Sequence, residues 1–403
     1  MHMNDRKLVI LMAVAQLGSL LPHVVVPAVM PTHLIPEWNL SYSEAGLMAA
    51  SYAAGYMFAV PVLTTLTDRT DARLILLCGS LLSGLATILF GVLASDLTSA
   101  ILLWGLAGIG FAGAYMPGLK ALTDRLDPGD SSRSVTLYTS SFSVGVGVSF
   151  LVSQIVAERW GWRPAFIVTG IGPAAMALVA LMLRPVVPSP RMGPLLDFRP
   201  VLRNRTAMGY VIGYGAHCFE LYGMRTWLVA FWGFVTAQAG GTTPIDAITV
   251  SVAVSVLALP ASVLGNEAAL RFGRHRAITA VMLCSALVAV AIGLTATVSP
   301  WVSLLLLTFY AFTVPADSGA LTSGVTAAAD ARFRGATLAV HSMVGFGLSA
   351  LGGWAVGVTI DSAGGSTSAQ GWMAAFLVMA GGILLGPLAL WWSRQEFGAG
   401  KRS

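Results

Sequence analysis

The residues best suited to chemistry lie in one apolar stretch of the chain, residues 208–235. This stretch contains His217, Glu220 and Arg225 among mostly hydrophobic neighbours. A charged side chain near the centre of a bilayer costs about 2.5–3.5 kcal/mol on insertion scales, so such residues usually face a cavity and carry function. The sequence therefore predicts a polar site on a membrane-embedded helix.

A helical projection places the polar residues of this stretch on one side. At 100° per residue, Tyr210, Tyr214, His217, Glu220 and Arg225 fall within a sector of about 140°. We expect Arg225 to bind an anionic group, because guanidinium holds carboxylates through two parallel hydrogen bonds. We expect Glu220 to carry a proton, because burial favours the neutral form of a carboxyl group. The alternative is a purely structural salt bridge between Glu220 and Arg225.

Other apolar stretches also contain candidate residues. Asp317 follows Pro315 at an expected helix break and is a second candidate proton carrier. His217 and His23 are candidates for proton relay or hydrogen bonding to a substrate. Tyr214 and the pair Tyr52 and Tyr56, one turn apart, are candidates for lining the path. For His23 and the tyrosines, simple packing is the alternative interpretation.

The amino-acid composition indicates that these residues lie in a membrane rather than in water. Of 403 residues, 56% are hydrophobic and only 10% are charged, with a mean hydropathy of +0.77. Soluble domains carry about 25% charged residues, whereas about 20 apolar residues span a bilayer core. We therefore predict an all-α integral membrane protein with twelve transmembrane helices. The expected spans are 8–30, 43–66, 72–94, 98–120, 133–157, 162–184, 206–235, 244–268, 277–297, 301–325, 334–358 and 372–394.

The positive charges follow the expected loops. With the N-terminus inside, nearly all Lys and Arg fall in inside loops; Arg159 and Arg163 fall outside, and Arg225 lies within a span. This is the positive-inside pattern, and it predicts that both termini are cytoplasmic. We expect a multi-pass protein of the inner (plasma) membrane. The net charge of +5 is then explained by topology, so nucleic acid is not expected as a partner.

The chain divides into two halves of similar plan. A polar segment at 184–205 separates six expected spans from six others, and a gap-free offset of 201 residues aligns Arg133 with Arg334 and Ser141 with Ser342. Parallel repeats of this kind occur in transporters. We predict an N-terminal six-helix bundle (1–184), a cytoplasmic linker (185–205) and a C-terminal six-helix bundle (206–403), related by pseudo-symmetry.

Three short motifs carry a family resemblance. Residues 64–73 read TTLTDRTDAR, residues 271–276 read RFGRHR, and residues 161–166 read GWRPAF. The first keeps the Asp-Arg and the final Arg of the pattern Gly-x-Leu-Ala-Asp-Arg-x-Gly-Arg-Arg but lacks both glycines. The second keeps the basic run. With these motifs and this architecture, the chain resembles the major facilitator superfamily, and more loosely its bacterial small-anion transporters, such as the cyanate and oxalate–formate groups.

The resemblance implies two bundles that rock around a central site by alternating access. Helices one, four, seven and ten would line the cavity, and helices three, six, nine and twelve would face lipid. The loop motifs would act as conformational latches, formed by Asp68, Arg69, Arg73, Arg271 and Arg274. The alternative for these arginines is that they only set the topology.

These inferences predict a secondary active transporter of a small anionic solute, coupled to protons as a symporter. The alternative is a proton-coupled exporter of lipophilic compounds, but the Gly-Pro signature of such exporters is absent from residues 143–150, and Trp104 stands where they favour arginine. A membrane sensor or scaffold is a third possibility, disfavoured by the short tails. The three cysteines form no CxxC pair, and neither a Walker lysine motif nor HExxH occurs. We expect no cofactor, no metal and no enzymatic activity, and we expect a monomer.

Overall fold

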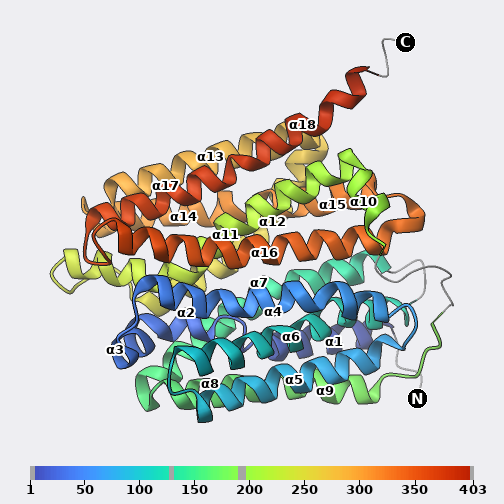
Figure 1. Ribbon diagram of the computed structural model, residues 1–403, viewed down its shortest axis with the longest axis horizontal. Helices are drawn as coiled ribbons and strands as arrows, with labels where there is room; N and C mark the ends of the chain where they lie inside the picture. The colour runs from blue at the N-terminus through green and yellow to red at the C-terminus, as the bar shows by residue number, and fades with distance from the viewer. Residues whose placement is uncertain (1–4, 127–130, 189–196, 400–403) are drawn as a thin grey trace. The chain divides into compact units, whose positions relative to one another are not determined.

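The computed structural model describes residues 5–126, 131–188 and 197–399, and every regular element in this part of the chain is a helix (Figure 1). The helices form two compact units. One comprises Met1–Asn39 and Ser51–Leu196, and the other comprises Leu40–Ala50 and Asp197–Ser403.

The first unit contains four long helices, α4 to α7, and several shorter segments. Its elements are α1 (Asp5–Ser19), α2 (Val25–Val29), a π-helical turn (Met30–Leu34), α3 (Ile35–Trp38), α4 (Tyr42–Leu66), α5 (Ala72–Leu93), α6 (Leu97–Thr123), α7 (Ser131–Trp160), α8 (Trp162–Ile171) and α9 (Pro173–Met182). Within it α5 packs against α6, α8 and α9, and α1 packs against α7 and α9. The first nine residues of α4, 42–50, are grouped with the second unit.

The second unit is built around one long helix, α11. Its elements are α10 (Arg199–Arg203), α11 (Arg205–Gln238), α12 (Ala247–Phe272), α13 (Arg274–Thr295), α14 (Pro300–Ala316), α15 (Ser318–Ala328), the 3₁₀ turn η2 (Ala331–Phe333), α16 (Arg334–Ser362), α17 (Ala369–Ile383) and α18 (Leu385–Ala399). Helix α11 contacts α15, α16, α17 and α18, so residues along α11 meet side chains from most of this unit.

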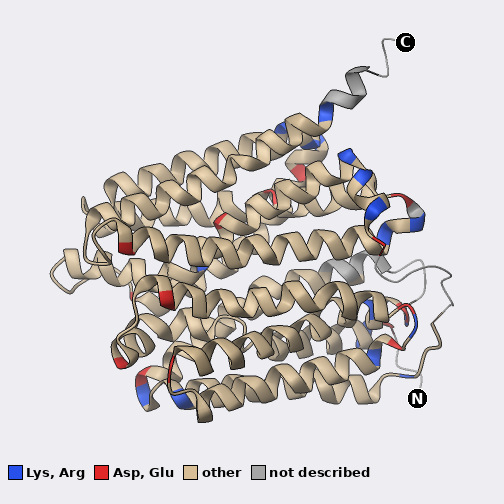
Figure 2. Cartoon of the chain, in the orientation of Figure 1, with Lys and Arg blue, Asp and Glu red and all other residues tan. Residues whose placement is uncertain are grey.

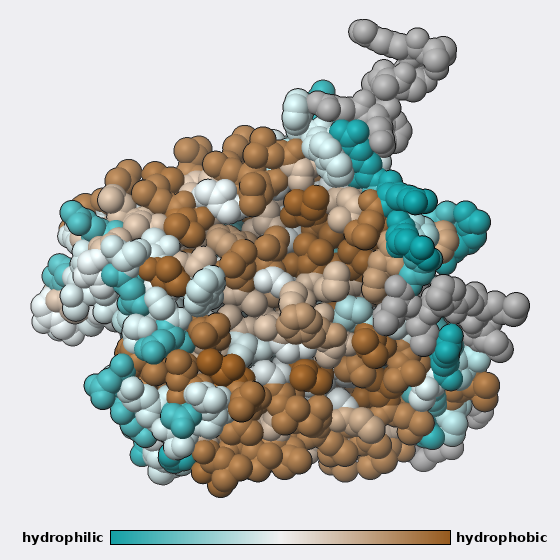
Figure 3. All heavy atoms as spheres, viewed as in Figure 1, coloured by the Kyte–Doolittle hydropathy of each residue, from teal (hydrophilic) through white to brown (hydrophobic). Residues whose placement is uncertain are grey.

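The described residues contain ten segments long and apolar enough to cross a membrane: 42–66, 72–93, 97–123, 137–160, 162–182, 247–272, 274–295, 300–328, 334–362 and 369–394. These agree closely with ten of the expected spans. The outer faces of these helices carry large exposed apolar side chains, such as Phe58 (73% exposed) and Leu287 (71% exposed). Contact of such surfaces with water would be unfavourable. Figure 3 shows apolar residues along the helices and polar residues at their ends.

The expected span 8–30 is interrupted rather than continuous. Helix α1 ends at Ser19, and a turn precedes α2. Pro22 has no backbone N–H to continue the helix. Ser149 on α7 satisfies the freed backbone, because its hydroxyl donates to the Leu21 carbonyl (2.6 Å) and accepts from the Val24 N–H (3.3 Å). The break is thus buried in protein, as irregular backbone within a bilayer must be.

The expected span 206–235 forms as one helix, α11, of 34 residues. It is long enough to cross a bilayer, but it is not among the ten most apolar segments. Its glycines, tyrosines and ionisable residues dilute its apolar character. The described helices therefore establish a polytopic helical protein.

Small residues let the helices of the second unit approach closely. A Cβ atom on Gly265 of α12 would overlap the carbonyl group of Ala316, at the junction of α14 and α15. A Cβ atom on Gly352 of α16 would overlap the carbonyl group of Phe219 on α11. Such small residues are typical of helix contacts in membranes, and these two fix the elements that carry the candidate site.

Asp361, at the end of α16, caps the first turn of α4 within the second unit. Its carboxylate accepts from the Tyr42 N–H (3.1 Å) and from the N–H and hydroxyl of Ser43 (both 2.6 Å). The Tyr42 ring stacks on Trp227 of α11, with centroids 5.0 Å apart. A carboxylate at a helix N-terminus is favoured by the helix dipole, so this turn is well anchored.

Candidate functional site

Glu220 occupies a fully buried position on α11. Its Oε1 accepts hydrogen bonds from the Ser285 hydroxyl on α13 (2.9 Å) and the Tyr310 hydroxyl on α14 (3.0 Å). Its Oε2 has no hydrogen-bond partner among the described residues. Burying a carboxyl group is costly unless it is paired or neutral. Glu220 is thus oriented by two neutral hydroxyl donors and keeps one oxygen available for a proton.

Asp317 lies where the tenth expected span breaks. Helix α14 ends at Ala316 and α15 begins at Ser318, which confirms the expected break. The Asp317 Oδ1 lies 2.7 Å from the His217 Nδ1 on α11, an ion-pair distance without hydrogen-bond alignment. Both side chains are buried, and Asp317 also interacts electrostatically with Glu220. The structure therefore brings together His217, Glu220 and Asp317.

Tyr214 extends this group toward α16. Its ring stacks on His341, with centroids 3.9 Å apart, and lies 5.6 Å from the ring of His217. His341 is buried and interacts electrostatically with His217. We call Tyr214, His217, Glu220, Asp317 and His341 the ionisable cluster. Its members lie on α11, at the junction of α14 and α15, and on α16, all within the second unit.

Arg225 lies on α11 beyond Glu220 and is 8% exposed. Its guanidinium is 5.0 Å from the centre of the Tyr222 ring, a cation–π contact. Its Nη1 has no hydrogen-bond partner among the described residues, and the described ion pairs do not include Glu220 with Arg225. Arg225 therefore has donor capacity left for an anion.

The first unit holds the other predicted substrate residues in an aromatic cluster. His23, next to the break after α1, packs against Tyr52 (5.4 Å), Phe111 (5.2 Å) and Phe142 (5.1 Å between ring centres). Tyr56 packs against Phe111 at 5.7 Å. His23, Tyr52 and Tyr56 are thus close together, and all three are buried. Their surroundings are compatible with either packing or a substrate contact.

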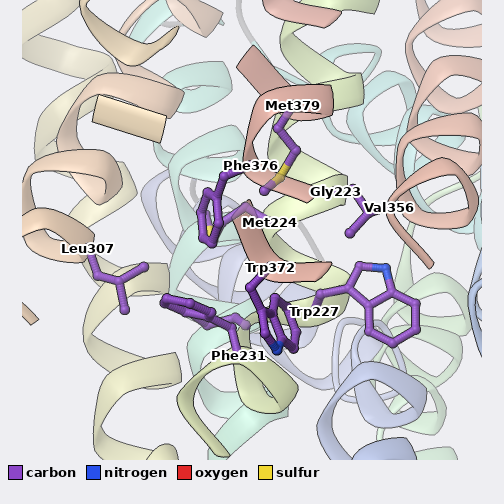
Figure 4. A pocket seen from close by; sticks show the side chains of 10 residues that line it. Gly223, Met224, Trp227, Phe231, Leu307, Val356, Trp372, Phe376 and Met379 are labelled. Atoms are coloured by element: carbon purple, nitrogen blue, oxygen red, sulfur yellow. The ribbon is translucent and has the colours of Figure 1, made fainter. Parts of the chain in front are cut away.

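An apolar pocket also lies beside α11 in the second unit (Figure 4). Trp227, Phe231, Trp372 and Phe376 supply most of its aromatic lining. Its volume is about 10 Å³, which is close to the minimum for one water molecule. This space is therefore a packing void of the aromatic core rather than a substrate site.

A network of charges fills the end of the first unit between α4 and α5. Its central carboxylate is Asp71, three residues beyond the expected Asp68. Asp71 accepts from Arg125 Nη2 (2.9 Å), pairs with Arg73 Nε (3.1 Å) and accepts from the Val186 N–H (2.9 Å). Arg125 also donates to the Arg184 carbonyl (2.6 Å). The network thus ties the α4–α5 loop to the end of α6 and the chain after α9.

Sequence reasoning proposed Arg73 for this network but missed Asp71 and Arg125. The signal for Asp71 was its position directly before α5, since aspartate is favoured as an N-cap, and it accepts from the Arg73 N–H at 3.0 Å. Arg271 and Arg274, expected in the second latch, end α12 and begin α13. There Arg274 lies beside the Tyr210 hydroxyl.

We expect the Asp71 network to lose its stabilising effect in acid. Burial favours a higher pKa for Asp71, but hydrogen bonds from Val186 and Arg73 and the pairing with Arg125 outweigh it and hold the pKa below its usual value. A lowered native pKa stabilises the protein above the unfolded pKa of about 4, and this stabilisation is lost as pH falls through the native pKa. Asp71→Asn should therefore lower the melting temperature at pH 7, and the difference from wild type should shrink below about pH 4.

The measurement is thermal unfolding of both proteins in detergent across this pH range. Asp124→Asn is the control, because its ion pair with Lys120 is partly exposed and pairs of this kind contribute little to stability. A difference between wild type and Asp71→Asn that stays constant down to about pH 3, below the unfolded pKa, would contradict this assignment of Asp71.

These features define the class of the protein: a polytopic helical membrane protein with ionisable groups buried at helix breaks. The model of the Major Facilitator Superfamily matches residues 10–353. The chain belongs to the major facilitator superfamily, whose members transport solutes.

Solved structures show the same fold over nearly the whole chain. A bacterial homologue of the human lysosomal transporter Spinster, in an inward-facing and occupied conformation, superposes with a TM-score of 0.78 at 17% identity, covering 98% of each chain. A mutant of the nucleoside transporter NupG superposes with a TM-score of 0.73 at 14% identity, covering 96% of this chain and 99% of that one. At such identities the likeness concerns the fold alone.

Proposed function

We propose that this chain is a proton-coupled secondary transporter of a small anionic solute. The observation that carries the proposal is the different environment of two buried groups on α11. Arg225 keeps an unused donor, while Glu220 is hydrogen-bonded to Ser285 and Tyr310. An arginine that is not neutralised by the nearby glutamate is suited to an anion. A carboxyl group held by neutral hydroxyl groups is suited to gain and lose a proton.

The proposal assigns a role to each part of the ionisable cluster. Arg225 binds the anion, with His217 and Tyr214 as further substrate contacts. Glu220 and Asp317 carry the proton, and the proximity of Asp317 to His217 lets the protonation state reach the substrate residues. His23, Tyr52 and Tyr56 are proposed contacts from the first unit. Asp68, Arg69, Arg73, Arg271 and Arg274 are proposed latches, and the Asp71 network is added to them.

The same proposal includes the topology expected from the sequence. The ten apolar segments, together with α11 and the interrupted first helix, would make twelve spans. This topology would place the arginine-rich helix ends in the cytoplasm. Figure 2 shows blue residues gathered at one end of α10, α11, α16 and α18. In the described second unit, Arg225 is the only Lys or Arg away from that end. This asymmetry supports cytoplasmic termini and an inner-membrane location.

The alternative, an exporter of lipophilic compounds, gains support from the aromatic cluster around His23. Aromatic rings bind apolar and cationic molecules. Both candidates are tested with purified protein in liposomes that contain a pH-sensitive dye. We expect small anions to cause proton entry. Proton release in response to lipophilic cations would favour the exporter, and no pH response to any compound from folded protein would contradict proton coupling.

A further inference from the structure

A cleft of about 530 Å³ lies at the beginning of the second unit. One wall is α10 with the residues before it, and the other is η2 with the residue before it. The lining residues are Asp197, Arg199, Pro200, Arg203, Asn204, Asp330, Arg332 and Phe333. Figure 3 shows strongly hydrophilic residues gathered at this end of α10 and α16. The cleft contains none of the residues proposed above for substrate or proton.

The two walls carry the same short motif, Asp-x-Arg. On the first, Arg199 donates to Asp197 through its backbone N–H (3.2 Å) and its Nε (2.9 Å). On the second, Arg332 donates to Asp330 through its backbone N–H (2.9 Å) and Nη2 (3.2 Å). Each aspartate therefore accepts hydrogen bonds from one edge of the guanidinium group of its arginine. A guanidinium has five N–H donors, so each arginine keeps donors for a ligand.

Asn204 fixes the distance between the two walls. Its Oδ1 accepts from the Ala207 N–H (3.0 Å) and caps α11, while its Nδ2 donates to the Ala328 carbonyl at the end of α15 (2.8 Å). The backbone of the two walls is thus held by hydrogen bonds, while the side chains of Arg199 (81% exposed) and Arg332 (80%) extend from it into solvent. Such preorganisation of the backbone lowers the cost of ordering a site when a ligand binds.

The charges of the cleft favour an anion. Three arginines against two aspartates leave one positive charge in excess. The aspartates stay ionised, because hydrogen bonds from Arg199 and Arg332 lower their pKa values. Arg203 lies between the Asp-x-Arg motifs in the chain and forms no ion pair among the described salt bridges. Its guanidinium group is therefore well suited to bind an anion in the cleft.

We propose that this cleft binds a phosphate group, carried either by an anionic phospholipid headgroup or by a soluble phosphate. Three arginines line the cleft, and guanidinium groups bind the oxygens of phosphate through paired hydrogen bonds. The cleft lies at the ends of membrane-spanning helices, where headgroups are found, and the exposed Leu202 beside Arg203 is suited to an acyl chain. Basic residues at such positions attract anionic lipid, each contributing about 1 kcal/mol.

The test is calorimetric titration of the full-length protein in detergent at fixed ionic strength. The probes are dihexanoyl-phosphatidylglycerol, dihexanoyl-phosphatidylcholine and inorganic phosphate. The variants are Arg203→Gln and Arg332→Gln. Arg276→Gln is the matched control, because Arg276 is exposed at the same end of the unit but lies outside the cleft. We expect each cleft variant to weaken binding about 5-fold, and the control to bind like wild type.

The pattern over the probes identifies the source of the phosphate. Binding of phosphatidylglycerol without inorganic phosphate would assign a lipid site, and binding of inorganic phosphate with equal affinity would assign a soluble ligand; both support the proposal. The proposal is overturned if the wild type binds neither phosphatidylglycerol nor inorganic phosphate. It is also overturned if Arg276→Gln weakens binding as much as the cleft variants do. Arg203→Lys provides a second variant, which should keep part of the affinity because its charge remains without the planar fork.

Discussion

Glu220→Gln should abolish proton-driven accumulation while leaving substrate exchange intact. Glutamine keeps the size of the side chain, and its carbonyl oxygen can still accept from Ser285 and Tyr310, which lie 2.9 and 3.0 Å from Oε1 in the native protein. It cannot bind and release a proton at the physiological range of pH. The transporter would then move substrate in both directions without using the proton gradient.

The experiment measures uphill uptake and counterflow in the same liposomes. In the variant we expect the accumulation ratio to fall to about one, because transport without coupling ends at equal concentrations, while counterflow continues. Ser285→Ala is the matched control: it removes one donor to Glu220 but keeps the carboxyl group, so coupling should persist. Full uphill transport by Glu220→Gln would transfer the proton role to Asp317, and Asp317→Asn would then be the decisive variant.

Much of the second unit's site was predictable from the sequence of one helix. The periodicity of α11 placed Tyr214, His217 and Glu220 on one side, and in the structure Tyr214 and Asp317 both lie beside His217, whereas Glu220 bonds to Ser285 and Tyr310. Pro315 marked the break at Asp317. These inferences worked because helix geometry fixes the relative directions of side chains a few residues apart.

The partners from other helices could not be predicted in the same way. Ser285 lies on α13, the ninth expected span, which the resemblance assigns to the lipid side, yet it is 1% exposed and bonds to Glu220. A hydroxyl group costs little in an apolar helix, so composition gives no warning of its direction. The first helix was expected to be continuous because Pro22 alone does not show whether another helix, here through Ser149, can satisfy the freed carbonyl.

The polar network at the end of the first unit shows a related limit. The motif predicted a charged latch formed by Asp68, Arg69 and Arg73 but did not indicate that Asp71 belongs to a charge network. Asp71 directly precedes α5 and caps it, and its other oxygen accepts from Arg125 and Val186. This role depends on the helix boundary, and boundaries are the least certain part of a prediction from sequence.

The second large effect is expected for Arg225→Ala, which should weaken binding of an anionic substrate about 30-fold or more. Removing one partner of a buried charge pair costs about 2–5 kcal/mol, and about 1.4 kcal/mol corresponds to a factor of ten. The measurement is competition binding with the anion that gives proton entry in the liposome assay. Arg225→Lys should lie between wild type and Arg225→Ala, because it keeps the charge but loses the two parallel donors.

Tyr222→Leu is the control for the cation–π contact, whose centroid distance of 5.0 Å indicates that the ring positions the guanidinium. Its effect should be smaller than that of Arg225→Ala, because such contacts contribute about 0.5–2 kcal/mol and the charge of Arg225 remains. Unchanged affinity in Arg225→Ala would show that the anion is bound elsewhere.

A structural role for Arg225 makes a different prediction, and a double-mutant cycle separates the two. If Arg225 paired with Glu220 to hold the helix, Glu220→Gln and Arg225→Ala would be strongly non-additive in thermal stability. The structure gives Glu220 its own hydroxyl partners and leaves an Arg225 donor unused, so the two losses of stability should be nearly additive. Additive stability combined with non-additive transport would mean that the two residues meet only through the substrate and the proton that they bind.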